Sequence, residues 1–501
     1  MPKVSVKVKW GKETYPGVEV NTDDDPVLFK AQIFALTGVQ PERQKVVCKG
    51  ITLKDDDWGN FKLTNNALVL VMGSKEEDVP AAPVEKTKFV EDMNESELAS
   101  ALDLPEGLIN LGNTCYMNAT VQCLKTVPEL KNALLSYDKS SGGGTAGDLT
   151  AALSETMSAL EAGGAGACAG AAARLLRALH STAPRFAERG PGGALAQQDA
   201  SECWAEIVRA LQQRLPVAPL ASAASDRTSV IEQYFGGTLD VELVCSEADE
   251  PPTKSKETFL QLSCFISQDV KYLQSGLRSK MSEQITKMSQ TLGRDAVYTK
   301  TSKISRLPAY LTVQFVRFYF KEKESINAKI LKDVKFPLDL DVYELCSPEL
   351  QERLAPMRAK FKELDDASVE SSLTARNKNH GDSKKEKGNK TAVPYWFEND
   401  VGSNNSGYYR LQAVLTHRGR SSSSGHYVAW VARGDTWLRC DDDTVTPVSE
   451  EEVLKLSGGG DWHCAYLLLY GPRILEIPQP EEPMLTDISE DPAGDPPTAL
   501  A

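Results

Sequence analysis

The sequence lacks paired cysteines, a long apolar run and an excess of basic residues, and each absence excludes a class of protein. Its ten cysteines include no Cys-x2-Cys pair, so a structural zinc site has little support. No apolar stretch approaches the length needed to cross a bilayer, and the amino terminus has no signal-peptide core. The formal net charge is −14, whereas proteins that bind nucleic acid carry basic faces. We therefore expect no cofactor and no nucleic-acid partner.

The chain is long enough for two to four domains and has an ordinary globular composition, with 41% hydrophobic and 25% charged residues in its 501. A disulfide framework is not expected in so long a chain without an export signal. We expect most of the thiols to be reduced and buried as small hydrophobic groups. This cysteine usage favours the cytosol, with the nucleus as a second compartment.

Residues 1–73 form the first predicted domain. "VSVKVKW" alternates like a half-buried strand, "PVLFKAQIFALTG" has helical spacing and ends at a glycine, and "QKVVCKG" and "ALVLVMG" have the composition of strands. This order of hairpin, helix and strands predicts a β-grasp domain. The stretch "LTGVQPERQKVVCKGITLKDDD" resembles ubiquitin. Because the chain continues past Met72-Gly73 without a terminal Gly-Gly, we expect a fused ubiquitin-like docking domain.

The rest of the chain divides by composition. Residues 74–104 are acidic and contain proline, which predicts a flexible linker. A large domain is predicted over 105–472, first helical and then rich in strands, and a polar segment at 366–392 without periodicity is expected to be a disordered insertion. The acidic, proline-rich residues 473–501 are expected to be an unstructured tail. The predicted fold class is α+β.

Cys115 is the first candidate catalytic residue. It follows the turn and cap formers "NLGNT" and precedes apolar side chains at helical spacing, so it is expected at the amino-terminal end of a helix. There the unpaired backbone N–H groups and the helix dipole favour the thiolate. The alternative is one more buried thiol, and position alone does not decide between the two.

A cysteine nucleophile needs a base, and the chain has only five histidines, at 180, 380, 417, 426 and 463. His426 starts a strand directly after the flexible loop "SSSSG", where a base can face a cleft. A tight turn near Gly434 would form a hairpin that brings the acidic run 441–443 within a residue or two of His426. One of these three carboxylates can orient the imidazole, although an acidic run is by default a solvated turn.

Asn110 lies five residues before Cys115. Its amide could donate to the oxyanion that forms when a thiolate attacks a carbonyl. The alternative is an asparagine that only forms the turn.

These motifs resemble a known family. "GLINLGNTCYMNATVQCL" is similar to the Cys box of the ubiquitin-specific proteases, and "SSGHYVAWV", "WLRCDDDTV" and "AYLLLYG" are similar to their His box. "QQDASECW" and "LPAYLTVQFVRF" match further blocks in the same order. The resemblance covers residues 105–472. With the ubiquitin-like domain in front, the chain most resembles the proteasome-associated branch of that family.

The resemblance implies a papain-like cysteine protease domain with fingers, palm and thumb, which hydrolyses the isopeptide bond after ubiquitin's terminal glycine. It makes Cys115 the nucleophile, His426 the base and Asp441 its orienting acid, with Asn110 and Asp442 assisting the oxyanion. Two loops would cover the cleft, one within residues 318–337 and one at residues 421–424. The residues that the resemblance places against ubiquitin are Gln198, Asp199, Phe318, Ser423, Gly425 and Tyr427.

The resemblance also implies partners and raises alternatives. The expected partners are ubiquitin, ubiquitin conjugates and the 26S proteasome regulatory particle, reached through the ubiquitin-like domain, with a monomeric free state. Zinc-binding members use paired cysteines in the fingers, whereas Cys245 and Cys264 are single, so we expect no metal. Cys440 also departs from the pattern, which prefers an aromatic residue there. A non-catalytic ubiquitin-binding proteasome regulator is the alternative, and processing of another ubiquitin-like modifier is a third reading.

Overall fold

The computed structural model describes residues 3–75, 102–138, 143–190, 192–217, 227–321, 326–377, 390–421, 424–460 and 462–478. The chain divides into two compact units, Met1–Asn94 and Glu95–Ala501. Among the described residues, no helix is long and apolar enough to cross a membrane.

The amino-terminal unit contains the predicted hairpin, helix and strands. Its five-stranded sheet has the order β2-β1-β5-β3-β4, and β1 and β5 are parallel. One helix packs its buried side on this sheet, with Phe29 and Ile33 in a core that includes Val69 and Val71. The elements are β1 Val4–Trp10, β2 Glu13–Val20, α1 Pro26–Thr37, β3 Lys45–Cys48, β4 Ile51–Thr52 and β5 Leu68–Met72.

The carboxy-terminal unit is built on a ten-stranded sheet whose main path is β19-β18-β17-β16-β20-β11-β8. Off this path lie β12, β13 and β14. The strands are β8 Leu262–Phe265, β11 Leu311–Val316, β12 Phe318–Lys321, β13 Ile326–Lys329, β14 Asp339–Asp341, β16 Tyr408–Ser421, β17 Ser424–Arg433, β18 Thr436–Asp441, β19 Thr444–Val448 and β20 Cys464–Pro472.

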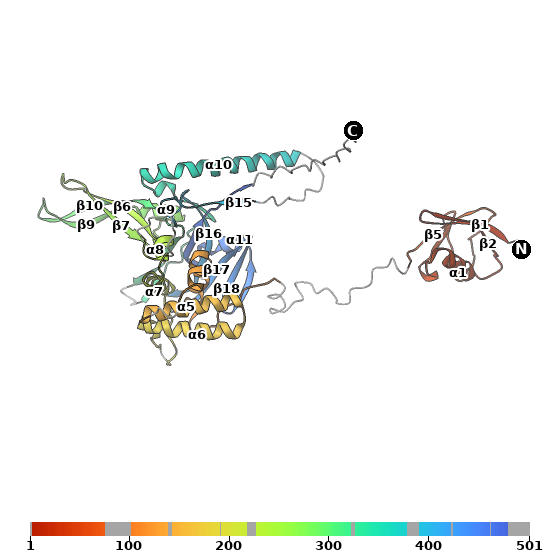
Figure 1. Ribbon diagram of the computed structural model, residues 1–501, viewed down its shortest axis with the longest axis horizontal. Coiled ribbons are helices and arrows are strands. Elements are labelled where there is room, and N and C mark those ends of the chain that lie inside the picture. Colours follow the sequence, from red (N-terminus) through yellow and green to blue (C-terminus); the bar gives the residue numbers. More distant parts are fainter. Residues whose placement is uncertain are drawn as a thin grey trace, which may run out of the picture. The chain divides into compact units, whose positions relative to one another are not determined.

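Each face of this sheet has its own core, because successive side chains of a strand point to opposite faces. In β17, Tyr427 and Ala429 join the core under the helical layer, whereas Val428 and Trp430 join the other core. The helical layer consists of α3 Cys115–Lys125, α4 Pro128–Leu135, α5 Thr145–Ala162, α6 Ala165–Thr182, α7 Ala200–Arg214 and α8 Val230–Phe235. Figure 1 shows α5 and α6 side by side on this side of the unit, and α10 on the opposite side.

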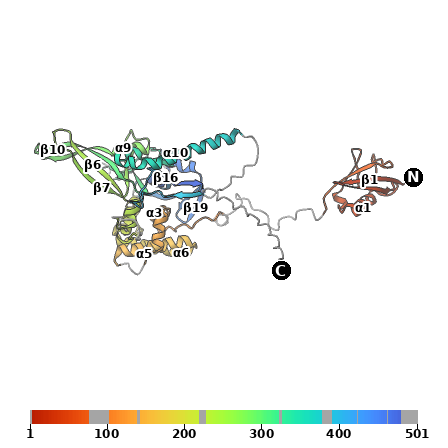
Figure 2. The ribbon, with the colours of Figure 1, turned by 45° about the horizontal axis from the view of Figure 1, so that its top comes forward.

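Four strands form a separate sheet in the order β7-β6-β10-β9, and both views show it extending away from the rest of this unit (Figures 1 and 2). Its small core contains Cys245, whereas Cys264 lies in one of the two large cores. The remaining elements are β6 Gly237–Cys245, β7 Thr253–Phe259, α9 Leu273–Lys280, β9 Ser282–Ser289, β10 Arg294–Arg306, α10 Pro348–Asn377, β15 Lys390–Val393, α11 Glu450–Leu454 and β21 Leu475–Pro478.

Two segments expected to be unstructured contain regular structure. Helix α10 continues to Asn377, so the first part of the 366–392 segment is helical, because an uninterrupted helix anchored by Leu350, Leu354 and Phe361 runs into it. Residues 390–393 and 475–478 pair as the antiparallel strands β15 and β21. The backbone N–H and C=O groups of each strand find their hydrogen-bond partners in the other. The expectation of disorder was wrong at these positions. Residues 378–389 and 479–501 lie outside the described part, as do linker residues 76–101.

Candidate active site

Cys115 is the first residue of α3, as the sequence predicts, and its side chain is buried with 1% exposed. The turn before it is held by Asn110, whose Oδ1 accepts hydrogen bonds from the backbone N–H of Gly112 at 2.9 Å and of Thr114 at 3.2 Å. Asn113 adopts the left-handed conformation, with φ 54°. The polar residues before the cysteine therefore form a tight turn that delivers it to the helix end, where backbone N–H groups are unpaired.

His426 contacts both other members of the predicted triad. Its Nε2 lies 2.6 Å from Oδ1 of Asp441, and the neighbouring Cys115 thiol also favours its charged form. The Asp441 carboxylate, and secondarily the Cys115 thiol, raises the pKa of His426 to about 10. Since Nε2 faces the carboxylate, Nδ1 is the ring nitrogen left for proton exchange with the thiol.

Asp441 is fixed from two sides. Its Oδ1 faces His426, and its Oδ2 accepts a hydrogen bond from Arg439 in the same strand. Together these two partners, His426 first, lower the pKa of the Asp441 carboxyl to about 2. The expected hairpin is present, because β17 pairs with β18 from Arg433–Thr436 to Ala429–Cys440 around a two-residue turn. This pairing brings the end of β18 beside the start of β17.

Asp442 is the centre of a second cluster and adopts a left-handed conformation, with φ 54°. Its Oδ2 accepts from Nδ2 of Asn110, and its Oδ1 accepts from Nδ2 of Asn118, both at 2.9 Å. Its carbonyl accepts from the backbone N–H of Leu108 at 2.8 Å. The structure thus brings Asn110 to the site, with its amide directed at Asp442. Sequence reasoning missed Asn118, which looks like an ordinary residue of an amphipathic helix.

Gln197 is another residue that sequence reasoning missed. Its Nε2 donates to the carbonyl of Gly425 at 2.8 Å and to Oδ1 of Asn113 at 3.2 Å. Gly425 directly precedes His426, and Asn113 lies two residues before Cys115. One side chain therefore joins the two segments that carry the thiol and the imidazole.

Three of the six predicted ubiquitin-contacting residues gather around the buried His417. Phe318 packs edge-on against its ring at 5.3 Å between centroids, and the Tyr427 ring lies at 4.7 Å. A Cβ added at Gly425 would come within 2.4 Å of His417 Nε2, so only glycine fits this close approach. Burial, with nearby Lys329 second, lowers the pKa of His417 to about 3.

The other three predicted contact residues lie apart from His417 or outside the described residues. Gln198 donates to the carbonyl of Arg185 at 2.9 Å. Asp199 caps α7 by accepting from the N–H of Ser201 and also accepts from the hydroxyl of Tyr466. Ser423 is not among the described residues.

Among the described residues, the only cluster of three acidic, histidine or cysteine side chains able to share a metal ion is His426, Asp441 and Asp442. These side chains already hydrogen-bond with one another or with the amides of Asn110 and Asn118, and these bonds explain their positions without an ion.

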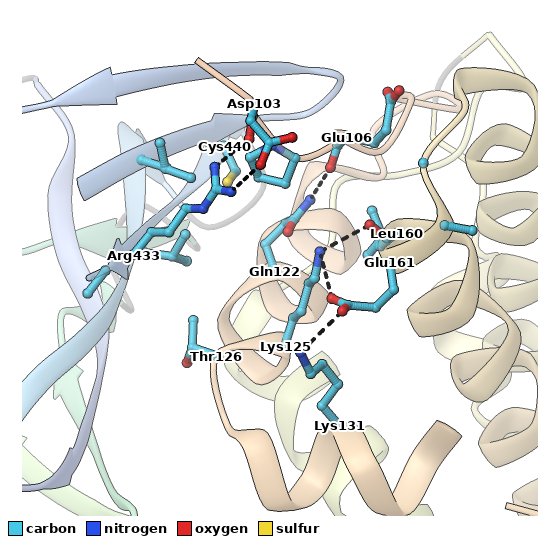
Figure 3. A pocket seen from close by; sticks show the side chains of 16 residues that line it. Asp103, Glu106, Gln122, Lys125, Thr126, Lys131, Leu160, Glu161, Arg433 and Cys440 are labelled. Carbon is cyan, nitrogen blue, oxygen red and sulfur yellow. Dashed lines mark hydrogen bonds and ion pairs between the residues drawn. The ribbon is translucent and has the colours of Figure 1, made fainter. Parts of the chain in front are cut away.

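A cavity of about 550 Å³ lies beside the carboxy-terminal end of α3, and no described residue that lines it belongs to the predicted triad. Figure 3 shows two groups of paired charges in its lining, Arg433 with Asp103 and Glu161 between Lys125 and Lys131. Glu106 also lines the cavity, and its carboxylate accepts a hydrogen bond from the backbone N–H of Gly164 at 3.2 Å.

Comparison with known proteins gives one consistent family. The family model described as ubiquitin carboxyl-terminal hydrolase matches residues 106–470. Ubiquitin carboxyl-terminal hydrolase 14 of Caenorhabditis elegans is 41% identical, over 97% of this chain and 98% of its own. Ubiquitin carboxyl-terminal hydrolase 7 of Arabidopsis thaliana is 38% identical, over 95% of this chain and all of its own.

A solved structure has a similar fold. A chain of the SAGA Ubp8/Sgf11/Sus1/Sgf73 DUB module bound to ubiquitin aldehyde is similar, with a TM-score of 0.50 and 22% identity over 75% of this chain and 74% of that one. The match to the family model and the full-length relatives decide the assignment. The chain belongs to the ubiquitin carboxyl-terminal hydrolase family, whose members are cysteine-protease deubiquitinases.

Proposed function

We propose that this deubiquitinase cleaves the isopeptide bond after the carboxy-terminal glycine of ubiquitin, with Cys115 as nucleophile and His426 as its base. The observation that carries the proposal is that His426 contacts both the Cys115 thiol and the Asp441 carboxylate. A thiol, an imidazole and an orienting acid in this order form the arrangement that activates a cysteine for acyl transfer. The bound ubiquitin in a similar module is consistent with this substrate.

The reaction follows from the positions of these groups. The thiolate attacks the glycine carbonyl carbon, and the tetrahedral oxyanion accepts hydrogen bonds from backbone N–H groups at the start of α3 and from Asn110. Asp442, which holds the Asn110 amide, assists by positioning it. The His426 imidazolium protonates the leaving lysine amine, leaving a thioester. His426 then takes a proton from water, which attacks the thioester and releases ubiquitin with a free carboxylate.

Substrate access in this proposal depends on the two segments around His417. The hairpin β12–β13 begins at Phe318, and Ala328 of β13 pairs with Ser421 beside the second loop. The tail of ubiquitin would pass between Phe318, Gly425 and Tyr427 to reach Cys115. In this proposal both segments move apart to let the carbonyl reach the sulfur.

The amino-terminal unit is proposed to be a ubiquitin-like β-grasp domain that docks on the proteasome. Its sheet and helix order support that fold, and the outer side of the sheet supports a docking role. Leu68, Leu70 and Met72 are exposed on β5, where they alternate with buried Val69 and Val71. An exposed apolar strip of this kind marks an interaction surface. With the amino-terminal unit docked on the proteasome, the carboxy-terminal unit would trim ubiquitin from proteasome-bound substrates.

A ubiquitin bearing a carboxy-terminal vinyl sulfone tests both parts. We expect a covalent adduct on Cys115, none with Cys115→Ala, and faster labelling when purified proteasomes are added. A Leu70→Asp variant should keep its labelling rate in the free state and lose the acceleration. Labelling of another cysteine would overturn the catalytic assignment, and no labelling in either state would favour the non-catalytic regulator. Equal acceleration of Leu70→Asp would overturn docking through the sheet. The same probe built on another modifier decides the third reading.

A further inference from the structure

Helix α1 of the amino-terminal unit is largely apolar on both of its sides, although the buried side also carries Lys30, which pairs with Asp55. One side packs on the sheet through Phe29 and Ile33. The opposite side consists of seven exposed residues of which only Gln32 is polar and none is charged: Val27, Leu28, Ala31, Gln32, Phe34, Ala35 and Leu36. We call these seven residues the outer face of α1. A helix that is apolar all round is normally buried on all sides.

The exposure of the outer face is large. Val27 and Leu28 are 48% and 56% exposed, and Phe34 and Leu36 are each 39% exposed. Within the described residues of the amino-terminal unit, no element covers them. Clustered exposed apolar side chains mark a binding surface, because a partner that removes them from water gains free energy of association.

A groove of about 500 Å³ runs beside the outer face, between α1 and β2. Leu36, Ala35 and Gln32 form one wall, and the segment from Tyr15 to Glu19 forms the other. Glu19 is the only charged residue among those that line it. An amphipathic helix binds in this way, with apolar anchors laid into a groove between two elements.

The charges around the outer face are mainly negative. Asp23, Asp24 and Asp25 are exposed immediately before α1, and Glu19 lies in the groove. Two lysines are near: Lys3 lies 3.9 Å from Glu19, and the side chain of Lys75 lies near Gly38 at the other end of the helix. With Asp24 and Asp25, the rim is negative where α1 begins. A second copy of this chain would bring the same negative rim and is disfavoured.

The outer face lies on the opposite side of the unit from the apolar strip on β5. Val69 and Val71 face α1, whereas Leu68, Leu70 and Met72 point away from it. A protein bound to the sheet therefore does not cover α1.

We propose that the outer face of α1 is a second docking surface, which takes an amphipathic helix whose apolar stripe is flanked by lysine or arginine. The apolar stripe would lie along the groove at Ala35 and Leu36 and extend over Leu28, and the basic flank would meet Asp24 and Asp25. The unit would then connect two proteins, one on each side.

The test uses the full chain with isotope-labelled isoleucine, leucine and valine methyl groups, observed by NMR. The probe is a synthetic amphipathic helix with a leucine stripe and lysine flanks, and its matched control carries glutamate flanks. We expect the lysine-flanked peptide to shift the methyl signals of Val27, Leu28 and Leu36 in a saturable way. The glutamate-flanked peptide should bind about tenfold more weakly, since several exposed charge pairs together supply about 1.4 kcal/mol.

Two matched variants locate the site. Leu28→Ser should weaken the lysine-flanked peptide about tenfold or more, whereas Leu68→Ser on the other side of the sheet should leave its affinity unchanged. Both positions are exposed, so neither change removes a core contact. Equal binding of the two peptides, or shifts centred on Leu68 and Leu70, would overturn the proposal. Two further results would overturn the proposal, because each would show that the outer face already has another occupant. In the first, the Leu28 signal shifts with protein concentration in the absence of peptide, which indicates a second copy of the chain. In the second, Leu28→Ser alters signals of the carboxy-terminal unit, which indicates a contact within the chain.

Discussion

The side-chain amide of Asn118 donates to Oδ1 of Asp442 at 2.9 Å, although 324 residues separate them in the chain. The same amide reaches the carbonyls of Leu108 at 3.0 Å and Ile109 at 3.2 Å. Because Asn118 lies one turn after Cys115 in α3, it fixes the helix that begins at Cys115 to the segment that carries Asn110 and to the loop that follows Asp441. If the proposed mechanism holds, Asn118 positions the nucleophile and the Asn110 amide.

We expect Asn118→Ala to lower kcat by about 10- to 100-fold with little change in KM, since hydrogen bonds to a charged group contribute about 1.5–3 kcal/mol. Hydrolysis of a fluorogenic ubiquitin conjugate measures this. Gln122→Ala is the matched control, because that amide, one turn further along α3, donates to the carbonyl of Glu106 instead. Its kcat should stay within about twofold. In a double-mutant cycle with Asp442→Ala the two losses should not add, and full additivity would contradict the coupling.

Gln197 provides the next prediction. Gln197→Ala should lower kcat by about 3- to 30-fold, because two neutral hydrogen bonds of about 1 kcal/mol each no longer join Asn113 to Gly425. KM should change little, since the side chain joins the two segments that carry Cys115 and His426. Gln198→Ala is the natural comparison: if Gln198 contacts ubiquitin, as the family resemblance implies, that variant should raise KM instead. An effect of Gln197→Ala on KM alone would contradict a positioning role.

The contrast between Gln197 and Gln198 illustrates what sequence could and could not provide. The position of Cys115 at a helix start, and the hairpin that brings Asp441 to His426, follow from local signals: a polar turn, apolar spacing and a two-residue turn. Local patterns of this kind fix elements within a short window. Gln197 and Gln198 are adjacent and chemically identical, so only the assembled fold determines which one reaches Gly425.

The same limit explains the other misses. Asn118 meets Asp442 only when α3 packs against the sheet, and α10 extends to Asn377 because its first turns are anchored in the core. The pairing of β15 with β21 joins two segments of four residues each, KTAV and LEIP, which are too short to show a period from which a strand could be predicted. Tertiary contacts override weak local preferences at all three places.

Asp441→Asn should move the basic side of the pH–rate profile. In the wild type, the Asp441 carboxylate raises the pKa of His426 to about 10, so the imidazolium that is proposed to protonate the leaving amine persists through the neutral range. A neutral amide removes the attraction, and the His426 pKa should fall towards its ordinary value of about 6.5. Turnover should then decline above about pH 6.5 instead of near pH 10, and kcat should fall by roughly four orders of magnitude if the serine-triad precedent applies. An unchanged profile between pH 6 and 10 would contradict this assignment.

Stability should fall in acid because of His417. Its pKa is lowered to about 3 in the folded chain and is about 6.5 when unfolded, so between these values the unfolded state binds a proton that the folded state does not. The free energy of unfolding therefore decreases as pH falls below about 6.5, by about 2 kcal/mol at pH 5 from this residue. Burial lowers the pKa of His463 to about 4, so this residue contributes in the same direction.

The variant His417→Leu tests this prediction. Its leucine side chain should still pack against the rings of Phe318 and Tyr427, but it has no group that titrates. Urea unfolding followed by tryptophan fluorescence at pH 7.5 and pH 5 should show a smaller acid loss in His417→Leu than in the wild type, and smaller again when His463→Leu is added. An identical acid loss in all three chains would mean that neither imidazole is held neutral by the fold.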